Sequence, residues 1–143
     1  MRKTGGSKAF LATGTMLAGL LAGVVTAAPA HAADGVCTGS YTSKNGSSGL
    51  HYVFPYNVAN NSLYCYLQYG HTGAGVRALQ KNLNNCYGRN LAVDGVYGKD
   101  TRSAVRYVQG RIGAKIDGIY GRETSAMKWA RYSNETGAKY DCR

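Results

Sequence analysis

The chain has 143 residues, of which 44% are hydrophobic, and this length fits one domain of ordinary size. Its 17 basic residues face only 7 acidic ones, which gives a formal net charge of +10 and favours a polyanionic partner.

Residues 1–32 have the pattern of a secretory signal peptide. Basic residues come first, an apolar stretch follows that is densest over 16–25, and Ala30-His31-Ala32 forms an A-x-A cleavage site. The apolar core is too short and too interrupted for a membrane anchor, because a spanning helix needs about 20 predominantly apolar residues. We therefore expect export, cleavage after Ala32 and no membrane span in the mature chain.

The mature chain would be basic and rich in tyrosine. Removal of Arg2, Lys3 and Lys8 with the signal leaves 14 basic against 7 acidic residues, a net charge of +7, and all 12 tyrosines lie in the mature part. Such a chain suits a polyanionic or carbohydrate partner. Nucleic acid would fit the charge but not the compartment, so we expect no nucleic-acid partner.

All four cysteines follow the cleavage site, and they are widely separated along the chain. An even number in an exported chain of this size indicates two disulfides, whereas a zinc site would need close pairs such as C-x-x-C. Three connectivities are open. We favour Cys37–Cys65 and Cys86–Cys142, because each bond then joins a segment to its own neighbourhood, and we expect no metal and no cofactor.

The segment after the cleavage site is predicted to be mostly irregular, with one hairpin. Thr38–Gly49 is rich in Ser, Thr, Gly and Asn and is predicted as a loop. Leu50–Tyr56 and Ser62–Tyr69 are rich in β-branched and aromatic residues, with a turn at Asn57–Asn61 between them, so we expect two short paired strands. Pro55 should confine the first strand to a sheet edge.

From Gly70 onward the hydrophobic period becomes helical. The first predicted helix has Thr72 as its N-cap and ends near Cys86, and its apolar stripe is Val76, Leu79 and Leu83. Two more helices are expected, over Lys99–Ile112 and over Arg122–Tyr132. The inward residues are Thr101, Ala104, Val105, Val108 and Ile112 in the second helix and Thr124, Met127 and Ala130 in the third. We expect these stripes to form the core.

The clearest signal is an internal repeat. Val93-Asp-Gly-Val-Tyr-Gly-Lys-Asp-Thr101 returns further along the chain as Ile116-Asp-Gly-Ile-Tyr-Gly-Arg-Glu-Thr124. Glycine permits a turn with positive φ, and the aspartate before it can accept backbone N–H bonds across that turn. Each copy is therefore predicted to be a structural turn that starts a helix, and the turn residues are Asp94, Gly95, Gly98, Asp117, Gly118 and Gly121.

These motifs resemble the peptidoglycan-binding domain found beside many bacterial cell-wall hydrolases. The resemblance rests on Gly70-His-Thr-Gly-Ala-Gly-Val76-Arg-Ala-Leu-Gln80, then Val93–Gly98, a helix and Ile116–Gly121, and it covers roughly residues 69–132. It implies a compact bundle of three helices that binds the wall without cutting it. The family often has proline after the motif glycine, where this chain has Lys99 and Arg122.

The residues needed for wall hydrolysis are not evident in the sequence. His51 and His71 lie in no metal-binding motif, and a cysteine nucleophile would need a free thiol. A glycosidase needs two carboxylates about 5–10 Å apart. Asp94 and Asp117, or Glu123 and Glu135, are the candidates. The matching repeat positions favour turn roles for the two aspartates, and we expect the glutamates to be a helix-start charge and a solvated tail residue. We therefore expect no enzymatic activity.

A ligand-binding surface is predicted near the starts of the second and third helices. Arginine can hold a stem-peptide carboxylate with two parallel bonds, tyrosine offers a flat apolar surface, and helix starts attract anions. The candidate ligand-binding residues are Tyr97, Lys99, Arg102, Tyr120 and Arg122. The two tyrosines could equally be core residues that pack the turns.

The combined prediction is a mainly α protein: a signal peptide (1–32), a disulfide-linked N-terminal extension (33–69) and a peptidoglycan-binding-like domain (70–143). The fold is a compact three-helix bundle with a short N-terminal β-hairpin extension and two disulfides. We expect a secreted, monomeric, non-catalytic protein that binds peptidoglycan or an associated anionic wall polymer. The alternative is a secreted module that binds or inhibits an exported protein, which apolar side chains exposed along an edge of Leu50–Tyr69 would favour.

Overall fold

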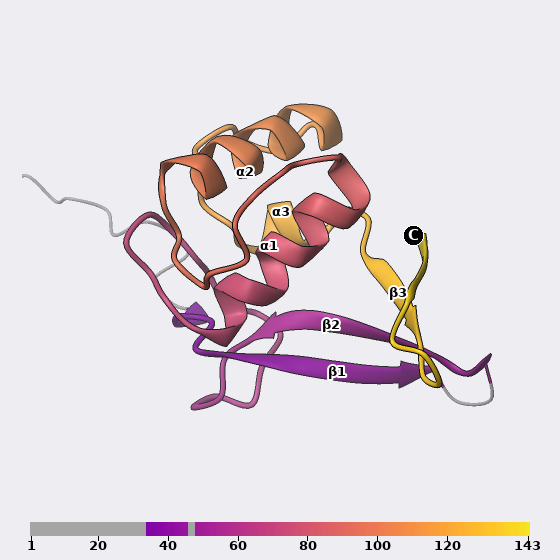
Figure 1. The fold of residues 1–143 in the computed structure, drawn as a ribbon. Helices are drawn as coiled ribbons and strands as arrows, with labels where there is room; N and C mark the ends of the chain where they lie inside the picture. Colours follow the sequence, from indigo (N-terminus) through magenta and orange to yellow (C-terminus); the bar gives the residue numbers. More distant parts are fainter. Residues whose placement is uncertain (1–33, 46–47) are drawn as a thin grey trace, which may run out of the picture.

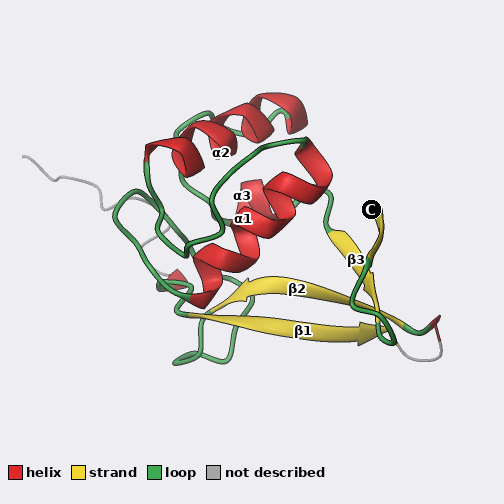
Figure 2. Ribbon diagram, in the orientation of Figure 1, coloured by secondary structure: helices red, strands yellow, loops and turns green. Residues whose placement is uncertain are grey.

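The computed structural model describes residues 34–45 and 48–143, so the predicted signal peptide lies outside the described residues. The elements, in order, are β1 (Gly39–Asn45), β2 (Leu50–Tyr56), α1 (Ala74–Tyr87), α2 (Lys99–Ile112), α3 (Arg122–Ser125), β3 (Ala130–Ser133) and β4 (Lys139–Cys142). α1 lies between the sheet and α2 (Figures 1 and 2). The helices and disulfides fit the prediction, but a four-stranded sheet accompanies them, so the described chain is not clearly mainly helical.

The sheet is antiparallel with strand order β1-β2-β3-β4. β1 pairs with β2 along its whole length, from Gly39 opposite Tyr56 to Asn45 opposite Leu50. The predicted pairing of Leu50–Tyr56 with Ser62–Tyr69 is therefore wrong, and the predicted loop Thr38–Gly49 supplies the partner strand instead. Strand preference depends on the neighbouring strand more than on composition, so pairing with β2 outweighs the loop-like residues of β1.

Pro55 lies beyond the part of β2 that pairs with β3. β3 pairs only with Leu50–Tyr52, so at Pro55 the strand β2 has one neighbour, β1. A residue without an N–H is tolerated there, as at the edge of a sheet. The edge prediction thus holds for this end of β2, although the strand as a whole lies inside the sheet.

The segment after β2 turns back and packs against the helices. Asn57 and Ser62 exchange backbone hydrogen bonds of 2.8 and 3.1 Å, which closes the predicted turn. The chain then makes single bridges, from Tyr66 to Val36 and from Leu67 to Tyr120, in place of a strand. Leu67 is fully buried, so this segment is part of the core.

Both disulfides have the pairing that we favoured. Cys37–Cys65 joins the residues before β1 to the segment after β2, and Cys86–Cys142 joins the end of α1 to the end of β4. No cysteine in the described chain is free.

α1 and α2 lie close to their predicted positions, and α2 has the predicted bounds. The N-cap of α1 is Gly73, with φ of 124°, and not Thr72, which forms a bridge with Val96. Gly88 ends α1 in the left-handed conformation, as a glycine there predicts. The predicted stripes of both helices are buried except at Ile112, which is half-buried; the buried members are Val76, Leu79, Leu83, Thr101, Ala104, Val105 and Val108.

The third helix is much shorter than predicted. α3 ends at Ser125, although Thr124, Met127 and Ala130 do face inward, with exposed fractions of 2–3%. The buried side chain of Asn82 donates to the carbonyl of Lys128 at 3.0 Å and accepts the N–H of Ala130 at 2.8 Å. These two bonds hold the backbone after α3 in an extended form, and β3 begins at Ala130.

Candidate functional site

Both repeat copies form a turn that is held by a glutamine from the preceding helix. In the first turn the amide of Gln80 donates to Asp94 Oδ1 at 2.9 Å and to the carbonyl of Val96 at 3.0 Å, and its oxygen accepts the N–H of Gly95 at 2.9 Å. Gly95 has φ of 78°, the left-handed conformation that glycine permits.

The second turn repeats these bonds. Gln109 donates to Asp117 Oδ1 at 2.8 Å and to the carbonyl of Ile119 at 2.9 Å, and it accepts the N–H of Gly118 at 2.9 Å. Gly118 has φ of 74°. In both turns a predicted structural aspartate accepts a backbone N–H two residues on, at 2.8 Å. These bonds favour the turn roles that we predicted for both aspartates.

The two glutamines are residues that sequence reasoning missed. Gln80 and Gln109 are 2% and 1% exposed, and each also donates to the threonine that ends the motif, Thr101 or Thr124. A second sequence match could have found them, because Val76-Arg-Ala-Leu-Gln80 resembles Val105-Arg-Tyr-Val-Gln109.

The carboxylate of Asp94 is stabilised in its ionised form. Its pKa is lowered, first because the N–H of Val96 donates to it and then because the amide of Gln80 does. An ionised acceptor strengthens both bonds, so the acidic residue is suited to hold the turn.

Tyr97 and Tyr120 lie in the core. They are 0% and 2% exposed, and burial raises the pKa of both hydroxyls. The hydroxyl of Tyr97 donates to the carbonyl of Gly118 at 3.1 Å, which ties one repeat copy to the other. Tyr120 packs edge-on against Trp129, with 6.1 Å between ring centroids. Their burial favours the core role over direct contact with a ligand.

Arg122 is held by the N-terminal extension. Its Nε and Nη2 donate to the two carboxylate oxygens of Asp34, at 2.8 and 2.6 Å. The guanidinium also lies 4.4 Å from the ring centroid of Tyr64. This arginine therefore links α3 to two points of the extension, and its bidentate face is already occupied by a carboxylate.

Lys99 and Arg102 lie together in an open hollow on α2. The hollow has a volume of about 480 Å³, and we call it the basic hollow; it is lined by Tyr69, Lys99, Arg102, Ser103 and Arg106. Its three cations are exposed, and among the described residues none of them forms an ion pair. Three exposed cations beside one another attract anionic groups by charge.

Two of these cations pack against the second turn. A Cβ atom on Gly118 would lie 2.7 Å from Cγ of Arg102 and 3.1 Å from Cγ of Arg106. Both arginine side chains therefore pack against the bare glycine, and both residues also line the basic hollow. The structure thus brings Lys99 and Arg102 together, adds Arg106, and leaves Tyr97, Tyr120 and Arg122 outside this hollow.

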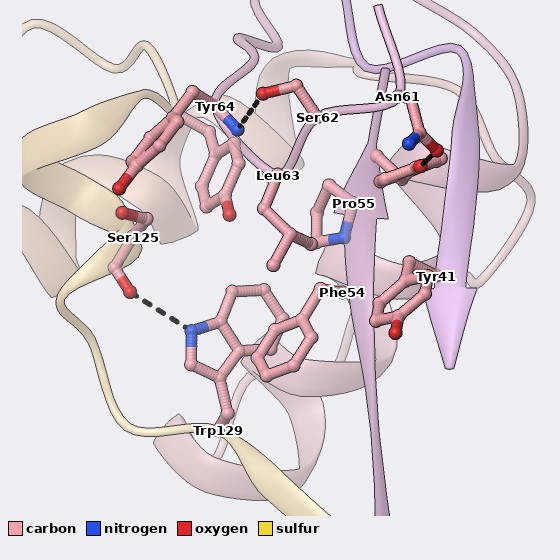
Figure 3. Close-up of a pocket in the computed structure, with 11 residues that line it drawn as sticks. Tyr41, Phe54, Pro55, Asn61, Ser62, Leu63, Tyr64, Ser125 and Trp129 are labelled. Carbon is pink, nitrogen blue, oxygen red and sulfur yellow. Dashed lines mark hydrogen bonds between the residues drawn. The ribbon is translucent and has the colours of Figure 1, made fainter. Parts of the chain in front are cut away.

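A larger groove lies between the sheet and the residues around α3 (Figure 3). It has a volume of about 630 Å³, and we call it the aromatic groove; it is lined by Tyr41, Phe54, Pro55, Tyr56, Asn61, Ser62, Leu63, Tyr64, Tyr120, Ser125 and Trp129. Sequence reasoning missed it because these residues come from separate segments that only the fold brings together.

The described residues show neither a candidate metal cluster nor a candidate membrane helix. Within 34–45 and 48–143, three His, Cys, Asp or Glu side chains nowhere gather closely enough to hold a metal. Over the same ranges, every helix is too short or too polar to cross a bilayer. His71 accepts the N–H of Gln68 through Nδ1 at 3.3 Å, and burial lowers the pKa of its ring.

Comparison with known proteins finds one family and similar solved structures. The model of the peptidoglycan binding domain family matches residues 72–127. The crystal structure of the SleB N-terminal domain is 35% identical over 42% of this chain and 82% of that domain, with a TM-score of 0.39. A peptidoglycan-binding protein from Clostridioides difficile, solved with glutamine hydroxamate, is 27% identical over 60% of this chain and 54% of that protein, with a TM-score of 0.45. No curated protein matches the chain.

Proposed function

Residues 72–127 belong to the peptidoglycan binding domain family, and from this premise we propose that the protein is an exported, non-catalytic module that binds peptidoglycan. The family match carries the proposal. The basic hollow supports it, because four of its five lining residues lie within the matched range.

The basic hollow suits the free carboxylates of peptidoglycan stem peptides. An arginine guanidinium offers parallel N–H donors that match the two oxygens of a carboxylate, and a lysine adds a point charge. Arg102 and Arg106 present two such forks, and Lys99 lies in the first turn of α2, where the helix dipole also favours an anion. Tyr69, which is 55% exposed, adds an apolar wall with a polar tip.

Binding is tested by co-sedimentation of mature protein with purified peptidoglycan that has been stripped of anionic polymers. The Debye length falls from about 10 Å at 0.1 M salt to about 3 Å at 1 M, so charge attraction between exposed groups weakens while shaped contacts persist. We expect strong retention at low salt and partial retention at high salt. Failure to sediment under either condition would contradict the proposal.

The proposal that the module does not cut the wall rests on the two motif aspartates. Both carboxylates hold their turns through hydrogen bonds to a glutamine and to a backbone N–H. Incubation with purified wall should therefore release no reducing ends or free amines above a blank. Reproducible release that disappears in Asp94→Asn or Asp117→Asn would show that the module is an enzyme.

The proposal of export rests on the signal-like residues 1–32 and on the two disulfides, which form in oxidising compartments. N-terminal sequencing of the protein recovered from culture medium or from the wall should begin at Ala33. Recovery in the cell with the N-terminus intact would contradict export.

A second candidate function is binding to an exported protein, and exposed apolar side chains after β2 support it. Val58, Leu63 and Tyr64 are 62%, 43% and 60% exposed. The same segment also packs against the helices through the buried Leu67, which supports the core alternative. Purified protein that forms a stoichiometric complex with an exported wall enzyme, but fails to sediment with peptidoglycan, would favour this second function.

A further inference from the structure

The floor of the aromatic groove is a cluster of packed rings. Trp129 is 6% exposed and lies edge-on to Phe54, with 5.0 Å between ring centroids. Its indole N–H donates to the carbonyl of Ser125 at 3.1 Å, which fixes the plane of the ring. Tyr120 packs on the other edge of Trp129. The floor is therefore rigid before any ligand arrives, and this lowers the cost of binding.

The walls of the groove are more exposed and come from the extension. Tyr41 stacks on Tyr56 with centroids 5.4 Å apart, and the Tyr56 hydroxyl donates to Asn61 Oδ1. Leu63 points toward Phe54 and Trp129 in Figure 3, with Tyr41 and Tyr64 on opposite sides. Tyr41 and Tyr64 keep 43% and 60% of their surface exposed, so their rings are available to a ligand.

The aromatic groove and the basic hollow differ in charge. The lining of the aromatic groove contains no acidic or basic side chain, whereas the basic hollow contains three cations. Hydroxyl groups and one amide surround the rings instead, from Tyr41, Tyr64, Asn61, Ser62 and Ser125. Arg122 lies over the ring of Tyr64, but its charge is paired with Asp34. The matching ligand is uncharged and carries both apolar faces and hydroxyl groups.

We propose that the aromatic groove binds N-acetylhexosamine units of a glycan strand. A pyranose ring presents C–H groups on its faces and hydroxyl groups around its rim, so it can lie on an aromatic ring while the edges hydrogen-bond. A volume of 630 Å³ lies within the range of about 300–1,000 Å³ that is typical of ligand sites. The choice of a wall sugar rests on the proposed function, while the neutral-sugar chemistry rests on the groove itself.

Together, the two sites would bind two different parts of one polymer. The basic hollow lies within the family-matched domain and takes the charged stem peptide, whereas the aromatic groove takes the neutral glycan. The extension supplies most of the groove, and Tyr120 and Ser125 of the matched range, with Trp129 just after it, complete it. The extension thus adds a second specificity to the family domain.

The experiment uses intrinsic fluorescence, because Trp129 is the single tryptophan of the chain. Mature protein is titrated with chitotetraose, a neutral tetramer of N-acetylglucosamine, and separately with D-alanyl-D-alanine, which carries a carboxylate but no sugar. We expect a saturable change in Trp129 emission with chitotetraose and none with the dipeptide. Tyr41→Ala should weaken the chitotetraose response by about fivefold, since one aromatic contact contributes on the order of 1 kcal/mol.

Tyr140→Ala is the matched control, because Tyr140 is 67% exposed and lies outside the groove. It should leave the response unchanged, and unchanged circular dichroism of both variants would show that folding is intact. A flat titration, or an equal response in Tyr41→Ala and Tyr140→Ala, would overturn the proposal even if the protein still sediments with peptidoglycan. A saturable response in protein that does not sediment with the wall would support the groove and contradict the proposed function.

Discussion

The two repeat turns share their interior bonds and differ in what covers them. A Cβ on Gly95 would meet Arg77 at 3.0 Å and the carbonyl oxygen of Gly73 at 3.1 Å. A Cβ on Gly118 would instead meet two arginine side chains, Arg102 and Arg106. The first turn is thus covered by one arginine and by backbone, and the second by two arginines.

The difference has a simple origin in the sequence. When the two Val-Arg-x-apolar-Gln segments are aligned, Arg77 matches Arg106 and Gly73 matches Arg102. The shared glutamine, aspartate and glycine build both turns, and Arg102, which aligns with Gly73, adds a second arginine beside Arg106 at the basic hollow. The repeat therefore accounts for the two turns, while this departure from it adds one cation to the proposed site.

The largest expected effect is the loss of stability when either turn glutamine is replaced. Gln80→Ala or Gln109→Ala leaves buried backbone groups and a carboxylate without a partner, and each loss of a buried partner costs about 1–3 kcal/mol. We expect each variant to lose about 3 kcal/mol of unfolding free energy. Urea unfolding of the disulfide-intact protein measures this loss. If one variant were tolerated and the other not, the two turns would not be equivalent.

A smaller loss of stability is expected when the turn glycines Gly95 and Gly118 are replaced. Gly95→Ala and Gly118→Ala force a left-handed conformation on a residue with a Cβ, which costs about 1–2 kcal/mol. Both should be destabilised to a similar extent. Gly118→Ala alone should also weaken sedimentation with peptidoglycan, because it displaces the stems of Arg102 and Arg106. If the two variants bound peptidoglycan equally, the packing of the arginines against Gly118 would not influence binding at the basic hollow.

Acid should weaken the first turn through Asp94. A carboxyl whose pKa is lowered by folding contributes stability above its unfolded value, near 3.8, and that contribution is lost as pH falls through the folded value. The melting temperature of Asp94→Asn should therefore fall less than that of wild type between about pH 6 and pH 2.5. Arg131 lowers the pKa of Asp141, so acid also removes a stabilising contribution of Asp141, and it does so equally in wild type and in Asp94→Asn. Parallel curves would show that Asp94 is not the group responsible.

The smallest effect is expected at Arg122, the first residue of α3, which directly follows the second turn. Its bond to Asp34 joins an arginine side chain that is 59% exposed to a carboxylate that is 10% exposed, and solvent at the arginine screens the pair. Asp34→Asn should lower the melting temperature by only a few degrees, and Asp34→Asn/Arg122→Gln should lower it by no more. A large additional loss in the double variant would mean that the two residues act separately.

Local patterns were sufficient to predict α1 and α2. Periodicity placed α2 at Lys99–Ile112, and the Asp-Gly motif identified the turns, because these features depend on neighbouring residues. The strand β1 was missed because its preference comes from β2. The third helix was predicted too long because Asn82, which belongs to α1 and is distant in sequence, holds the backbone at Lys128 and Ala130.

The candidate site was only partly predictable, because only some of its residues lie near the repeat in sequence. Lys99 and Arg102 were found because they adjoin the repeat, and Arg106 was missed although it lies one helical turn further. The partner of Arg122, Asp34, lies at the far end of the described chain, so sequence offered no sign that its guanidinium is occupied. The aromatic groove joins residues from Tyr41 to Trp129, and no local pattern connects them.

The most direct test compares Arg102→Gln/Arg106→Gln with Lys44→Gln/Lys128→Gln in sedimentation with stripped peptidoglycan. Both pairs remove two exposed charges and keep part of the side chain, but only the first pair lies in the basic hollow. At about 0.1 M salt, we predict that the first pair loses at least tenfold in affinity and that the second stays within about twofold of wild type. Equal losses in the two pairs would contradict the account and reduce the basic hollow to general surface charge.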